Sequence, residues 1–323
     1  MNYLNKQFLQ QHCQEILDFY TPRVVDIKGG YFQNYYDDGS LFAQGEKQLV
    51  SSTRIIVNYA LAAIIFKNDD YLTIAKHGLD FLETVHWQED TKNYAWTLTD
   101  NKPNDMTQQA YGYAFVLLAY AAVKKAGIIN SDEKLLETFE LLEQSSLNLK
   151  LNVVVQSGFN TDEINDFVGL TKDKNIAVRF IEEMPFNGGY KENLEMYSAR
   201  DIHADLKAHF SDLEKLPSEH GDTASLLSVK GYKGNIGVIA AFSRTFCNTC
   251  NRLRISSKGV IKSCLYDDGV FNIRDFMRSG VSDEQLADKF REIVRLKPKD
   301  GFEAEKMRKS PKEAMQSMSS IGG

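Results

Sequence analysis

The chain has 323 residues, enough for two ordinary domains, and its 43% hydrophobic and 25% charged residues exclude a disordered or fibrous protein. The net charge of -6 argues against a general nucleic-acid binder, and the absence of a run of 18 apolar residues argues against a membrane span. No basic segment followed by an apolar one opens the sequence, so we expect a cytoplasmic protein with neither nucleic-acid nor membrane partners.

The charge is unevenly distributed along the chain. Residues 1–145 carry 12 Lys and Arg against 19 Asp and Glu, whereas residues 146–323 carry 26 against 25. Both Trp and 11 of the 15 Tyr also fall in the first part. This break in composition predicts two units, 1–145 and 146–323.

Apolar residues recur at helical spacing through most of the first part. The polar residues 51–53 resemble a helix N-cap, and Asp38-Gly39 predicts the turn of a short hairpin. The result is a set of helical hairpins with long, aromatic-rich loops. The expected helices are 4–19, 55–66, 71–85, 110–123 and 134–142.

Three stretches of this part resemble the N-acylglucosamine 2-epimerase family, which includes mannose isomerases and cellobiose 2-epimerases. They are 29–32 (GGYF) together with Asp38-Gly39, 52–54 (STR) and 111–119 (YGYAFVLLA). The resemblance implies a helical-hairpin segment of an (α/α)6 barrel with a sugar pocket at one end, and it covers about five of twelve helices. Arg54 matches an arginine that helps to hold the sugar in that family, although a surface or helix-start arginine is the plain alternative.

Catalysis by this segment alone would need a proton-transfer base. The family's catalytic histidines come from later helices, and the helical pattern ends near residue 145. Of the histidines in the first part, we interpret His86 as structural and His77 as a solvated helix position. Arg54 cannot replace the missing base.

The second part changes to alternating strands and helices. Residues 149–155 and 176–181 are rich in β-branched residues and flank a helix at 162–171, which predicts a parallel βαβ unit. Four later segments predict strands of a smaller sheet, and two helices follow at 273–278 and 283–294. These four segments are 225–230, 237–241, 253–256 and 260–263.

Three of the four cysteines lie within 18 residues: Cys247, Cys250 and Cys264, with Cys13 far away. This is not the pattern of a secreted disulfide framework, and it indicates a metal or cluster site in a reducing compartment. Three thiolates leave one coordination position open on zinc or on one iron of a [4Fe-4S] cluster. Three unrelated buried thiols are the remaining alternative.

The residues around these cysteines resemble the GTP 3',8-cyclase family of molybdenum cofactor biosynthesis, whose members are radical S-adenosylmethionine enzymes. The matching stretches are 179–186 (RFIEEMPF), 234–239 (GNIGVI), 245–256 (TFCNTCNRLRIS) and 320–323 (SIGG). The resemblance runs from about Leu147 to the last residue. It implies part of a β/α barrel followed by a small C-terminal sheet that carries a cluster loop.

The resemblance also implies roles for individual residues. Cys247, Cys250 and Cys264 would hold a [4Fe-4S] cluster whose open iron binds the guanine of GTP. Arg252 and Arg254 alternate along a strand, so their side chains share a face and suit a triphosphate, and Leu253 lies between them in the GTP-binding stretch. Surface salt bridges are the plain alternative for the two arginines.

The other implied contacts lie farther along the chain. Lys150 would contact GTP, Met184 would lie at the S-adenosylmethionine site, and the tail residues Gly322 and Gly323 would reach the active site. The plain alternatives are a strand-edge lysine, a core methionine and a frayed tail.

One half of the cyclase is missing from this sequence. The family's first cluster sits on a C-x-x-x-C-x-x-C loop near the N-terminus, whereas residues 1–145 hold only Cys13. We therefore predict a protein that binds GTP and a [4Fe-4S] cluster without the full lyase reaction, and that uses S-adenosylmethionine only if the missing half is supplied. The expected partner chain is either a second copy in a homodimer or a complementing chain. The alternatives are a sugar 2-epimerase, isomerase or sugar-binding protein acting through residues 1–145, and a non-functional chimera.

Overall fold

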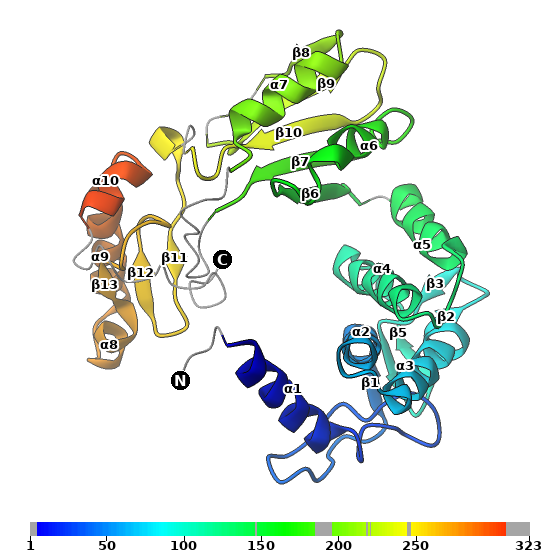
Figure 1. The fold of residues 1–323 in the computed structure, drawn as a ribbon. Helices are drawn as coiled ribbons and strands as arrows, with labels where there is room; N and C mark the ends of the chain where they lie inside the picture. The colour runs from blue at the N-terminus through cyan, green and yellow to red at the C-terminus, as the bar shows by residue number, and fades with distance from the viewer. Residues whose placement is uncertain are drawn as a thin grey trace. The chain divides into compact units, whose positions relative to one another are not determined.

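The computed structural model describes residues 5–145, 147–184, 196–217, 219, 221–243 and 247–307 (Figure 1). The chain divides into two compact units, Met1–Leu147 and Asn148–Gly323. The fold is mixed helix and sheet, with helical hairpins first and a parallel-containing sheet with a small second sheet after them. In the described ranges, none of these sheets closes into a barrel.

The first unit consists of helices joined by loops and two small antiparallel sheets, β1-β4-β5 and β2-β3. Its elements are α1 (Lys6–Tyr20), β1 (Glu46–Gln48), α2 (Leu49–Phe66), α3 (Asp69–Phe81), the π-helical turn η1 (Leu82–His86), β2 (Trp87–Gln88), β3 (Asn93–Tyr94), β4 (Thr97–Thr99), β5 (Lys102–Asp105), α4 (Ala110–Lys125) and α5 (Glu133–Gln144).

Helix α2 is the central helix of this unit and packs against α3 and α4. The sequence suggested that residues 51–53 cap this helix, but they do not. The helix already begins at Leu49, and Gln48 is in the N-cap position. By length and composition α2 could cross a membrane, contrary to the expectation from the sequence. However, Ile56 and Ala60 are fully buried in the unit, and half of the helix is covered, as in the core helix of a globular domain.

His86 is buried, as expected of a structural histidine. Its Nδ1 lies 3.0 Å from the Ala95 carbonyl oxygen, and its Nε2 lies 3.0 Å from Ser52 Oγ. A carbonyl only accepts, so Nδ1 carries the proton and Nε2 accepts from the hydroxyl. Burial lowers the pKa of His86 to about 4, so the ring is neutral.

The prediction that His77 is solvated was wrong. Its ring is half-buried on α3, Nε2 lies 2.9 Å from the Gly30 carbonyl oxygen, and the ring contacts Tyr31 edge-on. The Gly29-Gly30 turn supplies that carbonyl with φ of +118° and +70°, a backbone conformation that favours glycine. His77 therefore fastens this loop to α3.

The second unit contains a five-stranded sheet and a three-stranded sheet. Its elements are β6 (Lys150–Val155), the 3-10 turn η2 (Thr161–Glu163), α6 (Ile164–Gly169), β7 (Ala177–Glu182), α7 (Ala199–His209), β8 (Leu213–Lys215), β9 (Ala224–Val229), β10 (Asn235–Ile239), the 3-10 turn η3 (Cys247–Thr249), β11 (Arg254–Ile255), β12 (Val260–Lys262), β13 (Phe271–Asn272), α8 (Ile273–Arg278), α9 (Asp283–Arg295) and α10 (Gly301–Lys306).

The large sheet has the order β6-β7-β10-β9-β8, and β6, β7 and β10 run parallel. The predicted parallel pairing of the first two strands is confirmed. The assignment of 225–230 and 237–241 to the smaller sheet was wrong, because β9 and β10 join the large sheet. The small sheet is β11-β12-β13, as Figure 1 shows.

Helices α6 and α7 pack together, and α7 lies against β7 and β10. The β7 side chains Val178 and Phe180 are fully buried, while the alternate residues Arg179 and Ile181 are only partly covered. This alternation gives the sheet a core face and a more open face. The open face leads, at the carboxyl ends of β7 and β10, to the cavity described next.

Candidate functional site

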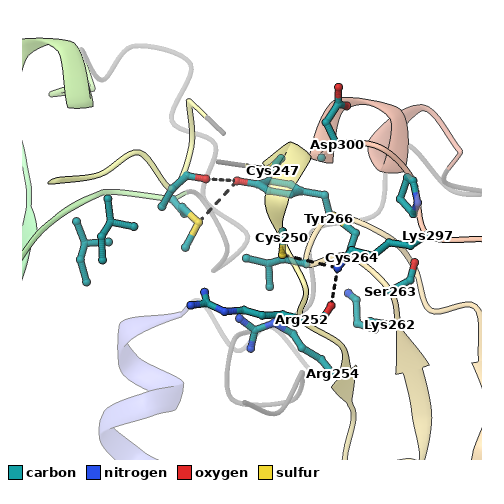
Figure 2. A pocket seen from close by; sticks show the side chains of 17 residues that line it. Cys247, Cys250, Arg252, Arg254, Lys262, Ser263, Cys264, Tyr266, Lys297 and Asp300 are labelled. Atoms are coloured by element: carbon teal, nitrogen blue, oxygen red, sulfur yellow. Dashed lines mark hydrogen bonds between the residues drawn. The ribbon is translucent and has the colours of Figure 1, made fainter. Parts of the chain in front are cut away.

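A cavity of about 170 Å³ lies where the carboxyl ends of β7 and β10 meet the cysteine loop, β12 and the segment before α10 (Figure 2). Ile181, Ile239 and Ala241 form part of its apolar wall. The other side carries thiols and cations. Its chemically active lining residues are Cys247, Cys250, Cys264, Arg252, Arg254, Lys262, Lys297 and Asp300.

Cys247 and Cys250 are brought together by the short turn η3. The Cys250 amide donates to the Cys247 carbonyl oxygen at 3.2 Å, which closes a single turn of chain. A two-residue spacer in such a turn places both thiols on the same side of the loop. Both side chains are half-buried at the cavity wall.

Cys264 comes from the turn that follows β12. One Asp267 carboxylate oxygen fixes this turn by accepting the Ser263 amide, the Ser263 hydroxyl and the Cys264 amide at 2.8, 2.9 and 2.8 Å. Burial raises the pKa of the Cys264 thiol, and the charges of Asp267 and of the other two cysteines raise it further. All three thiols line the same cavity.

Four cations share the cavity with these thiols. Arg254 on β11 lies directly opposite Lys262 on β12, and Arg252 lies two residues earlier. Lys262 is only 4% exposed, which is unusual for a lysine. Lys297 completes the set, and among the lining residues that the structure describes Asp300 is the one carboxylate. The balance of charge favours an anionic ligand.

Met184 lines the same cavity just beyond the end of β7. The Tyr266 hydroxyl lies 3.7 Å from Met184 Sδ and donates to the Ala241 carbonyl oxygen at 2.8 Å. Met184, Tyr266 and Ala304 pack in one apolar cluster. Met184 is thus packed in this apolar cluster and also lies at the cavity wall. The two expectations for this residue, a core methionine and a contact to a ligand, are therefore compatible.

Two residues predicted to bind GTP lie elsewhere. Leu253 packs against the apolar cluster of Ile261, Ile273 and Ile293. Lys150 is exposed at the start of β6, opposite Ala177. Lys150 shares a sheet face with Ile181, which lines the cavity. However, Ile181 lies four positions beyond Ala177 along β7, a distance of about 13 Å.

Gly322 and Gly323 lie outside the described residues. The predicted positions Pro185, Thr245 and Phe246 also lie outside them.

Arg54 lies in the first unit, at a separate cavity of about 300 Å³. The guanidinium carbon lies 5.0 Å from the centre of the Phe115 ring, an ordinary cation–π distance. Gln33, Asn58 and Tyr35 line the same cavity. Polar groups of this kind with aromatic walls can hold a neutral polyol.

Donor chemistry fits a soft metal or an iron–sulfur cluster at the thiol cavity, because three cysteines line one space. Within the part of the chain that the structure describes, however, no three His, Cys, Asp or Glu side chains are assembled as a metal-ligand set. The thiols share the cavity without converging on one point.

Sequence reasoning missed Lys262, Tyr266 and Lys297 as cavity residues. Lys262 could have been found, since it lies two residues before Cys264 on a predicted strand. Lys297 carries no local signal, because it is 47 residues from Cys250 and reaches the loop only through the tertiary fold.

Comparison with known families gives two separate matches. Residues 176–303 match the family model Molybdenum Cofactor Synthesis C, and residues 30–163 match the model of the N-acylglucosamine 2-epimerase (GlcNAc 2-epimerase) family. The chain thus joins a segment similar to sugar epimerases to a segment similar to the C-terminal part of molybdenum cofactor synthesis proteins. The epimerase match extends past Leu147, the end of the first compact unit.

Particular relatives agree with the match to molybdenum cofactor synthesis proteins. The chain is 38% identical over 173 residues to Molybdenum cofactor biosynthesis protein 1 of Drosophila melanogaster, covering 53% of this chain and 31% of that protein. It is 35% identical to the GTP 3',8-cyclase of Clostridium perfringens, covering 53% and 52%, and 38% identical to that of Listeria welshimeri, covering 63% and 61%. The chain therefore spans between 31% and 61% of the length of these relatives.

Solved structures also match part of the chain. A D-mannose isomerase matches with a TM-score of 0.43 at 35% identity, over 44% of this chain and 36% of that one. A cellobiose 2-epimerase from Spirochaeta thermophila matches with a TM-score of 0.38 at 24% identity, over 44% and 37%.

Proposed function

We propose that the second unit binds GTP and a [4Fe-4S] cluster at the thiol cavity, in the manner of the GTP 3',8-cyclases that it resembles. The observation that carries this proposal is the shared cavity: Cys247, Cys250 and Cys264 line it together with Arg252 and Arg254. These are the residues that the resemblance singles out, and they lie on separate segments between Cys247 and Cys264. The place of such a protein would be molybdenum cofactor biosynthesis in the cytoplasm.

Three thiolates would hold the cluster and leave one iron open to a nitrogen or oxygen ligand of the base. Arg252 and Arg254 would pair with phosphate oxygens, because guanidinium donors match the geometry of phosphate. The apolar wall formed by Ile181 and Ile239 would exclude water from the base. Radical chemistry on S-adenosylmethionine near Met184 would require a different chain to supply a further cluster, because this sequence has no second set of cysteines.

Anaerobic reconstitution of the full chain with iron and sulfide tests this proposal. We expect about four irons per chain, and a cluster spectrum that changes on addition of GTP but not of ATP. Cys264→Ser should lose cluster binding, whereas Cys13→Ser should keep it, because Cys13 is an exposed thiol on α1 of the other unit. A full cluster in Cys264→Ser, or no iron in the unaltered chain, would overturn the proposal.

A second candidate function, sugar binding by the first unit, rests on the cavity at Arg54 and on the match of residues 30–163 to the epimerase family. Calorimetric titration with mannose and N-acetylglucosamine tests it. Binding that is lost in Arg54→Gln and kept in Lys67→Gln, a variant at the exposed C-cap of α2, would support it. The absence of binding would reject it, and failure of both units to bind their ligands would favour a non-functional chimera.

A further inference from the structure

Lys297 contacts the cysteine loop at two points. Its Nζ lies 2.7 Å from the Arg252 carbonyl oxygen and 3.7 Å from Cys250 Sγ (Figure 2). One ammonium group thus donates both to a predicted cluster ligand and to the backbone of a predicted GTP-binding residue.

The chain presents Lys297 from a rigid position. Helix α9 ends at Arg295, and Pro298, whose ring restricts φ, follows the lysine directly. Ile293, in the last turns of α9, is buried against Ile261 of the small sheet. The side chain therefore reaches the loop from an anchored helix end rather than from a free surface loop.

A cation at this distance acts on the sulfur electrostatically. Hydrogen bonds and positive charge near the thiolates of an iron–sulfur cluster stabilise its reduced, more negative state and so raise its reduction potential. The contact with the Arg252 carbonyl adds a mechanical role, since it holds the chain between Cys250 and Arg252 in one conformation.

We propose that Lys297 is a positioning residue of the cluster site: it fixes the Cys250 sulfur and the Arg252 backbone as one unit, and it raises the reduction potential of the cluster that the cysteines hold. The inference rests on the proposed function of this cavity. Lys297 itself need not touch the substrate.

Lys297→Met tests the proposal in the reconstituted full chain, with Lys299→Met as the matched control. Lys299 lies two residues away in the same segment and is exposed, so its removal changes the net charge equally without touching the loop. We expect Lys297→Met to load about four irons and to have a lower reduction potential than the control. It should also bind GTP about tenfold more weakly, which is the lower end of the effect expected from losing a hydrogen bond made by a charged group.

Two further variants separate charge from packing. Lys297→Arg keeps the cation and should have the reduction potential of the unaltered chain. Lys297→Gln keeps only a neutral donor, so its reduction potential should be as low as that of Lys297→Met. A normally loaded cluster with an unchanged potential in both Lys297→Met and Lys297→Gln would overturn the inference and leave the proposed function intact. If the unaltered chain itself binds no cluster, the proposed function fails, and the inference fails with it.

Discussion

Arg254 and Lys262 lie directly opposite each other on β11 and β12, and both line the cavity. Like charges in this register destabilise an antiparallel pair. Both side chains face one cavity, so an anion bound there would interact with the two cations together.

Replacing Arg254 by Gln should weaken GTP binding by about 10- to 100-fold, since a hydrogen bond to a charged group contributes about 1.5–3 kcal/mol. The same change should alter the free energy of unfolding of the ligand-free protein by no more than about 1 kcal/mol, because Arg254 is only partly buried. Calorimetric titration and thermal unfolding measure the two effects. Lys258→Gln, in the exposed turn of the same hairpin, is the control and should bind GTP normally; equal affinity in both variants would contradict the assignment.

Glu182, at the end of β7, should be essential to the fold of the second unit. It is 1% exposed, and its carboxylate accepts the amides of Ala199, Phe242 and Ser243 at 3.1, 2.8 and 2.6 Å and the Ser243 hydroxyl at 2.6 Å. It thereby joins the start of α7 to the segment that leads into the cysteine loop.

Glu182→Gln should lower the free energy of unfolding by about 2–4 kcal/mol, because an amide cannot accept from both sides and leaves buried amides unpaired. The neighbouring Glu183→Gln should cost no more than about 1 kcal/mol, since Glu183 is only half-buried and pairs with Gln156. Urea unfolding of the two variants measures the difference. Equal losses would show that the Glu182 contacts are not the cause.

The stability of the first unit should fall as the pH drops below 6.5, because of His86. Its pKa is lowered by burial from 6.5 to about 4, so between these values the unfolded chain takes up a proton that the folded chain does not. The loss begins near pH 6.5 and is complete near pH 4, and amounts to about 3 kcal/mol. Urea unfolding at several pH values should show this slope between pH 6.5 and 5, and His86→Gln should remove it; an unchanged slope in the variant would exclude His86 as the source.

Lys47 and Asp26 form a buried ion pair with an Nζ–Oδ2 distance of 2.7 Å. Burial by itself would raise the pKa of Asp26, but the hydrogen bond and charge of Lys47 outweigh it and the pKa is lowered. Asn101 also accepts from Lys47 at 2.8 Å, so the pair ties the Asp26 loop to the β4–β5 turn.

Lys47→Met alone should destabilise the first unit by about 3–5 kcal/mol, because it leaves a buried carboxylate without its partner. The double variant Lys47→Met with Asp26→Asn should recover much of this loss. A double-mutant cycle from urea unfolding measures the coupling. Additive losses in the cycle would show that the two side chains act independently.

Local patterns in the sequence were sufficient for most of the secondary structure. Periodic apolar residues predicted α4, α5 and α9 to within a few residues, and β-branched runs predicted β6 and β7. The start of α2 was misplaced, because Ser52 and Thr53 resemble caps but lie inside the helix. There Ser52 bonds His86, and Thr53 donates to the Leu49 carbonyl oxygen at 2.8 Å. Helix α7 was missed, although Ser198 and Asp201 form a capping box at its start.

The sequence by itself determined which atoms are available: three thiols and two arginines, at spacings that local turns and strand alternation convert into shared faces. Only the tertiary structure decided that β9 and β10 join the large sheet, and that Lys262 and Lys297 reach the same cavity. It also placed Lys150 at the far end of β6. The reason is physical: spacing fixes the orientation of neighbours within a few residues, whereas contacts across 47 residues, such as Lys297 with Cys250, depend on how whole helices and sheets pack.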